Sequence, residues 1–363
     1  MKSIAIINGS KINDGITQGS LALYKTLKKI GYDVKWFQIM DTKNKSEYFL
    51  GDYMISGIAL PSYTISNGIN RLIFLKKKLN SIDSDMIFLS DPTLVAPLRK
   101  LSNVIVKFHD FRPLSNHADK FSTTLMFKYI MPKLRLLKWG IFISEFTKSE
   151  AINFSLKPEW SFVLPEPSLN LFPEKSRMKR SREILGEEGL TFTYIATDRQ
   201  YKNIKFFLEL TEAFKIHNNA RFLLVSKLKN HTMKLIQKKY GNVKVIDNVA
   251  DIREIYDETD VLLYPSLYDG FGRPIIEAMQ FGIPVIVSDI EPFIEITGGN
   301  SIRCEPNNTK SWIDQMNKLY NREYYSNWSN LSKARSLHFE LEAFEKSVKL
   351  IFSDIQNHYD KLN

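Results

Sequence analysis

The sequence predicts an α/β fold built from two doubly wound parallel-sheet domains, and three observations support this prediction. The chain has 363 residues, which is too long for one ordinary domain and fits two of about 170 residues each. Short apolar runs of strand length recur along the chain and end in polar or glycine-containing loops. Helical segments follow many of these loops, and such alternation is typical of parallel sheets covered by helices.

The first domain is expected over residues 1–170. A helix is predicted between its first two strands, after a polar loop that contains Gly15. Another strand runs directly into His109, and open α/β sheets bind ligands at the carboxyl ends of their strands. His109 is therefore a candidate site residue, although a histidine that only caps a strand would give the same pattern. The strands are expected at residues 3–7, 34–39, 85–89, 103–108, 141–144 and 162–165.

The second domain is expected over residues 190–336, after a charged segment at 171–189 that we interpret as a linker. Residues 337–363 are expected to form a terminal helix. The loop at 197–203 opens a helix and carries two cations, Arg199 and Lys202. The strands of this domain are expected at residues 190–196, 221–226, 243–245, 260–265 and 284–288.

The most informative segment covers residues 266–286, SLYDGFGRPIIEAMQFGIPVI. Gly270 and Gly272 end an apolar strand, and Pro274 suits the first turn of the helix that follows. Such a loop directs free backbone amides and the positive end of a helix towards a ligand, and a diphosphate is the natural occupant. Asp269 and Glu277 have seven residues between them, so they can contact the reacting end of the ligand and a ribose diol, respectively.

This segment resembles the signature of retaining glycosyltransferases with the GT-B architecture, in particular the family 4 group (glycosyl transferases group 1). The family pattern has two glutamates separated by seven residues around Gly-Phe-Gly, followed by Gly-x-Pro-Val. Asp269 stands where the family usually has the first glutamate. The resemblance covers nearly the whole chain and is densest over residues 190–306. The matching residues are Gly270, Phe271, Gly272, Pro274, Glu277, Ala278, Met279, Gly282, Pro284 and Val285.

The resemblance implies two Rossmann-like domains facing a cleft, with the C-terminal helix crossing back to the first domain. It also implies a retaining, metal-independent transfer of a sugar from a UDP- or GDP-linked donor to a hydroxyl of a glycan or lipid-linked acceptor. Neither a cofactor nor a metal is expected, because no Asp-x-Asp cluster is placed to chelate a divalent ion beside a nucleotide.

The resemblance further assigns roles to individual residues. Lys202 matches the family lysine that holds the donor diphosphate, whereas Thr197 replaces the family arginine, so Arg199 is the candidate for the missing charge. Gly15 matches a family glycine beside the donor phosphates. The predicted catalytic residues are Asp269 and His109, and the predicted donor-binding residues are Lys202, Arg199, Glu277, Gly270, Phe271, Gly272, Arg273 and Gly15.

Composition suggests the partners and the compartment. The formal charge is +10, which favours anionic ligands, but no nucleic-acid-binding module is recognisable. Cys304 is the only cysteine, and no apolar run is long enough to span a membrane, so we expect a cytoplasmic protein. Residues 74–79, 127–129 and 133–139 interleave cations with large apolar groups. They predict either peripheral contact with an anionic membrane surface or helices with one buried face.

Two alternatives remain at this point. A sugar-nucleotide epimerase would share the fold and release an altered sugar without an acceptor. A catalytically weak member that binds a nucleotide sugar or glycan as a partner subunit is favoured by Asp269 and by the missing arginine at Thr197.

Overall fold

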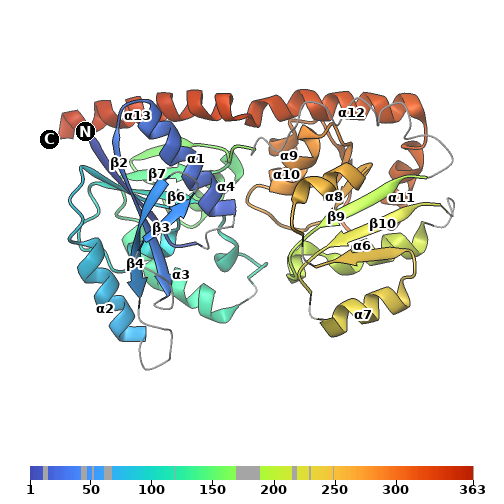
Figure 1. Cartoon of the computed structure of the whole chain (residues 1–363), viewed down its shortest axis with the longest axis horizontal. Coiled ribbons are helices and arrows are strands. Elements are labelled where there is room, and N and C mark those ends of the chain that lie inside the picture. The colour runs from blue at the N-terminus through green and yellow to red at the C-terminus, as the bar shows by residue number, and fades with distance from the viewer. Residues whose placement is uncertain are drawn as a thin grey trace. The chain divides into compact units, whose positions relative to one another are not determined.

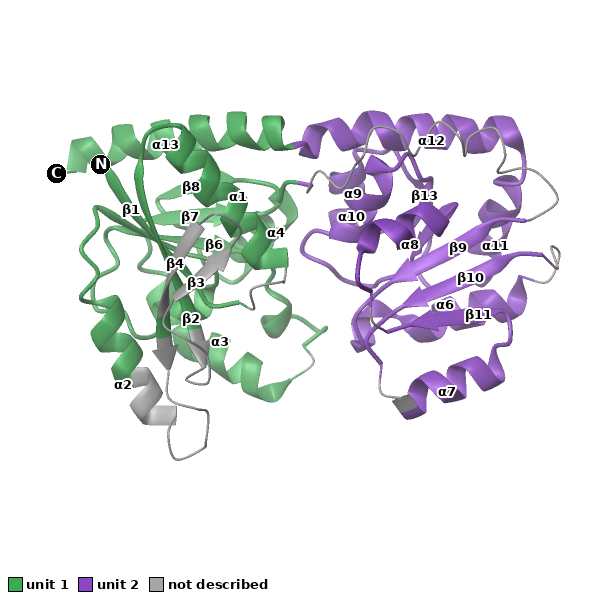
Figure 2. Ribbon diagram, in the orientation of Figure 1, with its two compact units in different colours: residues 1–167, 341–363 green, residues 168–340 purple. Residues whose placement is uncertain are grey.

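The computed structural model forms two compact units, coloured separately in Figure 2. Unit 1 comprises residues 1–167 and 341–363, and unit 2 comprises residues 168–340. The structure describes residues 1–10, 15–41, 47–50, 53–60, 68–118, 120–168, 189–214, 219–228, 230–247 and 249–362. The predicted linker at 171–189 therefore lies, except for Gly189, outside the described residues.

Unit 1 contains an eight-stranded sheet in the order β3-β4-β2-β1-β5-β6-β7-β8, parallel except for the β3–β4 pair (Figure 1). Its strands are β1 (Ser3–Asn8), β2 (Asp33–Asp41), β3 (Glu47–Leu50), β4 (Tyr53–Leu60), β5 (Met86–Leu89), β6 (Val104–Phe108), β7 (Trp139–Phe142) and β8 (Trp160–Val163). Its helices are α1 (Gly15–Lys29), α2 (Gly68–Leu79), α3 (Phe121–Leu134), α4 (Glu145–Asn153) and α13 (Leu341–Leu362), with the 3₁₀ helices η2 (Pro92–Val95) and η3 (Arg112–Leu114).

Both faces of this sheet are buried. Ile4 and Ile6 of β1 belong to a core shared with α1 and α13, whereas Ala5 and Ile7 belong to a second core shared with α3. Successive side chains of a strand point to opposite faces, so this alternation shows that helices cover the sheet on both sides. A doubly wound unit results, as the sequence predicts.

Unit 2 contains a fully parallel six-stranded sheet in the order β11-β10-β9-β12-β13-β14. Its strands are β9 (Thr191–Ile195), β10 (Arg221–Val225), β11 (Val243–Ile246), β12 (Val261–Tyr264), β13 (Val285–Ser288) and β14 (Ile302–Cys304). Its helices are α6 (Ile204–Ala213), α7 (Asn230–Lys239), α8 (Ile252–Glu258), α9 (Arg273–Gln280), α10 (Glu291–Thr297), α11 (Thr309–Lys318) and α12 (Arg322–Ser336), with the 3₁₀ helices η4 (Gln200–Lys202) and η5 (Leu337–Phe339).

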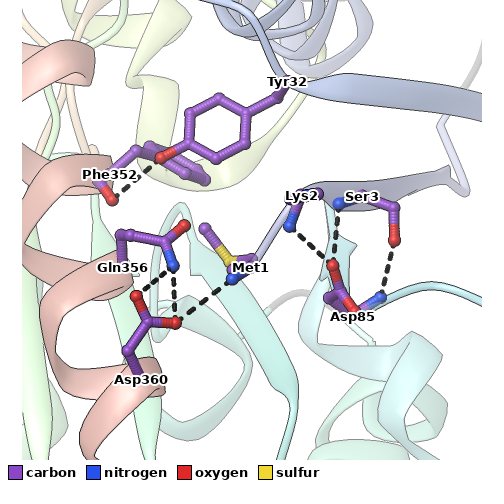
Figure 3. A network of polar contacts seen from close by, with 8 residues as sticks. All are labelled: Met1, Lys2, Ser3, Tyr32, Asp85, Phe352, Gln356 and Asp360. Atoms are coloured by element: carbon purple, nitrogen blue, oxygen red, sulfur yellow. Dashed lines mark hydrogen bonds and ion pairs between the residues drawn. The ribbon is translucent and has the colours of Figure 1, made fainter.

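The C-terminal helix α13 is part of unit 1, and polar contacts secure it there (Figure 3). The hydroxyl of Tyr32 donates to the carbonyl of Phe352 at 3.2 Å, and the N-terminal ammonium of Met1 pairs with Asp360 at 3.2 Å. Beside them, the carboxylate of Asp85 accepts the backbone N–H groups of residues 2 and 3 and has a lowered pKa because of these two bonds. The end of the chain is thus tied to the start of β1.

Several predicted boundaries are wrong in detail, and the strand expected at 162–165 is β8 (Trp160–Val163). The strand expected at 141–144 is β7 (Trp139–Phe142), and Ser144 instead caps α4 by accepting the N–H of Thr147 at 3.0 Å. The terminal helix begins at Leu341 rather than at residue 337, because residues 337–339 form the 3₁₀ helix η5. The β3–β4 hairpin was not anticipated.

Candidate functional site

The loop between β12 and α9 has the backbone geometry that its glycines predict. Gly272 caps α9 at a φ of 87°, in the left-handed region that favours glycine. A Cβ on Gly272 would also lie 3.0 Å from Cδ1 of Ile275. Pro274 occupies the first turn, so it costs α9 no internal hydrogen bond. Within this first turn the N–H of Ile275 donates to the carbonyl of Gly272 at 2.9 Å.

Lys202 and Asp269 meet beside this loop. The Nζ of Lys202 lies 2.5 Å from Oδ2 of Asp269 and 3.0 Å from the hydroxyl of Tyr264, which in turn donates to the same Oδ2 at 2.8 Å. The Lys202 side chain is 10% exposed and the Asp269 side chain is 22% exposed. The carboxylate is therefore the more accessible part of this cluster.

Backbone contacts fix Lys202 in this position. It ends η4, and the next residue, Asn203, has a φ of 55° and donates from Nδ2 of its side chain to the carbonyl of Pro265 at 3.2 Å. The carbonyl of Tyr201 accepts the N–H of Leu267 at 2.8 Å. The loop after β9 is thus joined to the loop after β12, and these strands are neighbours in the sheet.

The hydroxyl of Tyr264 remains a hydrogen-bond donor. Burial, and then the negative charge of Asp269, raise the pKa of Tyr264 well above its usual value, so it stays neutral at physiological pH. The sequence analysis did not select Tyr264, because it occupies an apolar strand where a tyrosine looks like a core residue.

Glu277 lies in the second turn of α9 and has two partners. Its Oε2 accepts the hydroxyl of Tyr256 at 2.7 Å, and its Oε1 lies 3.5 Å from Nη2 of Arg273. Tyr256 comes from α8 and is fully buried, and burial, followed by the charge of Glu277, raises its pKa well above the usual value. Arg273 therefore holds a candidate site carboxylate, and Tyr256 is a site residue that sequence reasoning missed.

The other predicted donor-binding residues of unit 2 take different positions. Arg199 is half-buried and caps η4, three residues before Lys202. Gly270 is buried in the loop before α9. The ring of Phe271 is buried and packs edge-on against Phe339, with 5.8 Å between ring centroids. Phe271 thus packs the loop against η5 within unit 2.

Unit 1 carries the remaining two predicted residues. Gly15 is the first residue of α1, and the next residue, Ile16, lines a pocket of about 280 Å³ together with His109, Asp91, Arg112 and other side chains. His109 follows β6 directly, as predicted. The pocket therefore lies at the carboxyl end of β6, where open α/β sheets bind ligands.

Both ring nitrogens of His109 face protein acceptors. Nε2 lies 3.0 Å from the carbonyl oxygen of Ser90, and Nδ1 lies 3.5 Å from Oε1 of Glu166. Glu166 is also paired with the buried Lys107 at 2.8 Å. The sequence analysis selected neither Glu166 nor Lys107.

Within the described part of the chain, no cluster of three or more histidine, cysteine or acidic side chains is arranged to hold a metal ion. Nor does any helix in that part combine the length and apolarity needed to cross a membrane.

Comparison with known proteins finds a matching family. Residues 176–335 match the family model of glycosyl transferases group 1, and this segment holds every unit 2 site residue. The predicted resemblance is confirmed at this level, and the narrower family 4 assignment stays a prediction.

A curated relative and two solved structures are also similar to this chain. The O-antigen chain mannosyltransferase RfbU of Salmonella typhimurium is 28% identical over 222 residues, and the match covers 58% of this chain and 59% of the relative. Sucrose-phosphate synthase from Thermosynechococcus elongatus has a TM-score of 0.77 at 14% identity, with 99% of this chain and 100% of that chain covered. HepE from Anabaena, solved with UDP and glucose, has a TM-score of 0.74 at 16% identity, with 98% and 100% covered. These structures confirm the predicted class of two Rossmann-like GT-B units.

Proposed function

We propose that this protein is a glycosyltransferase that moves a sugar from a nucleoside diphosphate donor to a hydroxyl group of an acceptor. The observation that carries the proposal is the cluster of Lys202, Tyr264 and Asp269 beside the loop before α9. This cluster lies inside the segment that matches the group 1 family. The likeness to a mannosyltransferase and to a protein solved with UDP and glucose supports a nucleotide sugar as the donor.

The donor would be held mainly by unit 2. The ammonium of Lys202, with Arg199 in the same loop, supplies positive charge for the diphosphate. The positive end of α9, which begins directly after Gly272, would also favour an anion at this loop. Glu277, positioned by Tyr256, would accept hydrogen bonds from the ribose.

Asp269 would bind the sugar. Both contacts of its carboxylate use Oδ2, and Oδ1 makes no hydrogen bond with any part of the chain that the structure describes. Oδ1 can therefore accept a sugar hydroxyl while Oδ2 stays paired with Lys202. This arrangement links the sugar subsite to the diphosphate subsite through a single side chain.

For the reaction we propose a metal-independent transfer with retention, as the family resemblance implies. The acceptor oxygen forms a bond to the anomeric carbon on the face from which the diphosphate leaves, and the bond between that carbon and the phosphate oxygen breaks. The departing phosphate oxygen takes the proton of the acceptor hydroxyl. Lys202 would stabilise the negative charge that grows on the diphosphate, because a fixed cation stabilises such charge without reorganising at the moment of reaction.

The acceptor we propose is a glycan, carried on a lipid. The supporting feature is the α3 surface, which we define as the exposed apolar side chains of Phe121, Leu125, Met126 and Tyr129. The helix has no acidic residue, and Lys120 and Lys128 flank these side chains. Met126 also lines the unit 1 pocket, so an acceptor anchored in a bilayer that contacts the α3 surface would be close to that pocket.

Parts of the predicted segments at 127–129 and 133–139 are less suited to membrane contact. Lys133 donates to the carbonyls of Ala96 and Leu98 at 2.5 and 2.8 Å, so its charge serves the fold of unit 1. Phe127 and Leu134 are buried in the core. We therefore propose the α3 surface, most of which precedes residue 127, for membrane contact.

A ligand panel tests the proposal. Thermal shift and calorimetry with UDP, GDP, ADP and their sugar conjugates are expected to show selective binding of one nucleotide, unchanged by EDTA and weakened in Glu277→Ala. Release of free sugar or transfer to an added glycan then reports turnover. Binding without any turnover would favour a partner subunit, and an altered sugar released without an acceptor would favour an epimerase. No binding by any nucleotide would overturn the proposal.

A further inference from the structure

Unit 1 contains a buried charge that the proposed reaction does not use. Lys107 lies in β6, all five residues of which are buried, and its side chain is 1% exposed. Its Nζ is 2.8 Å from Oε1 of Glu166, which is 4% exposed. A lysine in a fully buried strand is costly unless it is paired, so Lys107 requires a negatively charged partner such as Glu166.

The fold makes room for the Glu166 carboxylate. Glu166 follows β8, and its carboxylate lies against Gly19 of α1. A Cβ on Gly19 would lie 1.8 Å from Oε2 of Glu166. Only glycine at this helical position leaves space for the carboxylate, so α1, β6 and the segment after β8 converge on it.

The same carboxylate oxygen faces His109. Oε1 of Glu166 is 3.5 Å from Nδ1 of the ring, and Nε2 is 3.0 Å from the carbonyl of Ser90. A carbonyl oxygen only accepts hydrogen bonds, so Nε2 carries a proton. A neutral ring then has no proton on Nδ1, so the contact with Glu166 is attractive only when His109, on the wall of the unit 1 pocket, is protonated.

We propose that Glu166, held by Lys107, is a positioning residue that sets the orientation and protonation of His109 in the unit 1 pocket. This inference rests on the proposed function, which places the acceptor close to the unit 1 pocket. Glu166 acts through His109 and does not itself reach the pocket. Through this contact, residues that look like core residues control the charge that a substrate hydroxyl meets.

The surrounding charges give this role a measurable direction. Burial lowers the pKa of His109 below its usual value, the charge of Glu166 opposes this effect, and the charge of Lys107 reinforces it. Asp91, which also lines the pocket, and the carbonyl of Ser90 raise the pKa. Removing the charge of Glu166 and removing that of Lys107 are therefore expected to move the pKa in opposite directions.

The test is a titration of the histidine rings by NMR, on the full chain labelled at histidine and without any substrate. Glu166→Gln is expected to lower the pKa of His109, and Lys107→Gln is expected to raise it. His117 serves as the internal reference, and Glu345→Gln, which breaks the surface pair with Lys29, is the control for losing an ion pair in the same unit. If both variants fold and the NMR chemical shifts and the pKa of His109 are the same as in the wild type, the inference is overturned.

Two further variants keep the test decisive if an unpaired buried charge prevents folding. The double variant Lys107→Gln with Glu166→Gln removes both charges and leaves neither unpaired. It is expected to lower the pKa of His109, because Glu166 has the larger effect of the two. Glu166→Asp keeps the charge and withdraws it by one methylene, so an intermediate pKa is expected. A pKa equal to that of the wild type in both would contradict the inference.

This titration is independent of the donor site. If no nucleotide binds, the proposed function fails while the behaviour of His109 still stands. If nucleotide binding is normal but the pKa of His109 is the same in the variants as in the wild type, only the proposed role of Glu166 is contradicted. Where turnover is measured, Glu166→Gln is expected to shift the pH profile of kcat/KM in the direction of the ring pKa, with nucleotide affinity unchanged.

Discussion

The Nζ of Lys202 lies 2.5 Å from Oδ2 of Asp269, although 67 positions separate the two residues in the chain. They meet because β9 and β12 are adjacent and parallel, so the loops at their carboxyl ends share one edge of the sheet. Asp269 neutralises part of the charge that a diphosphate would use. The pair can persist when an anion binds, but the charge of Asp269 weakens the attraction of the ammonium for that anion.

The first prediction concerns the cation of this pair. Lys202→Met is expected to weaken binding of the preferred nucleoside diphosphate by about 10- to 100-fold, since a hydrogen bond to a charged group contributes roughly 1.5–3 kcal/mol. Calorimetry measures the change. Lys205→Met is the matched control, because Lys205 is three residues away and 90% exposed. Equal affinities of wild type and Lys202→Met would show that the diphosphate binds elsewhere.

The second prediction concerns the anion of the pair, where the effects should have opposite signs. Asp269→Asn keeps the shape of the side chain and frees the charge of Lys202. We expect the bare nucleoside diphosphate to bind roughly five-fold more tightly, which corresponds to about 1 kcal/mol for a partly exposed pair. Turnover of the nucleotide sugar is expected to fall, because the contact to the sugar is weakened. Parallel losses of nucleotide affinity and turnover would argue against this division of roles.

The third prediction concerns the residue that holds Glu277. Tyr256→Phe removes only the hydroxyl that donates to Oε2 at 2.7 Å. Nucleotide affinity is expected to fall about five-fold, because a lost hydrogen bond costs roughly 1 kcal/mol. Tyr324→Phe removes a comparable bond in the same unit, from the Tyr324 hydroxyl to Gln315 at 2.7 Å, and should leave the affinity unchanged. A similar effect of both variants would indicate general loosening of unit 2.

Local chemistry explains why the loop before α9 could be predicted from the sequence. The start of α9 depends on residues that are close in the chain, namely a glycine with a φ of 87° followed by a proline in the first turn. The same holds for the alternation of apolar strands and helices in both units. Neither feature requires knowledge of a distant partner.

The parts of the site that were missed depend on distant partners. Tyr264 and Tyr256 lie in β12 and α8, where a tyrosine is an ordinary core residue until its hydroxyl is seen beside a carboxylate. Lys107 is hidden in an apolar strand, and Glu166 only replaces a turn residue in the sequence. Their pairing needs the space at Gly19, which no local pattern reveals.

The fourth prediction concerns the backbone of the loop. Gly272→Ala is expected to destabilise unit 2 by about 1–2 kcal/mol, because alanine is strained at a φ of 87°. Its Cβ would also crowd Ile275 at 3.0 Å. Urea unfolding followed by circular dichroism measures the loss. Gly241→Ala, where a Cβ meets no atom within 4 Å, should change the free energy of unfolding by less than about 0.5 kcal/mol.

The last prediction concerns the α3 surface. Phe121, Leu125 and Tyr129 are 82%, 57% and 69% exposed and follow one another at a spacing of four residues, so they share one face of α3. Large apolar groups beside lysines suit insertion into an anionic bilayer interface. Because fully burying one large apolar side chain contributes about 1.5–3 kcal/mol, replacing two of them should have a large effect.

The experiment is co-sedimentation with vesicles of phosphatidylglycerol and phosphatidylcholine, compared with vesicles of phosphatidylcholine alone. The wild type is expected to bind the anionic vesicles, and Phe121→Ser with Tyr129→Ser should weaken that binding by at least about ten-fold. Leu350→Ser is the matched control, because Leu350 is 72% exposed on α13 of the same unit. If the control loses as much binding as the double variant, adsorption does not depend on the α3 surface. If the wild type binds both kinds of vesicle equally, the lysines beside Phe121 and Tyr129 do not direct it, and if it binds neither, a soluble acceptor is favoured instead.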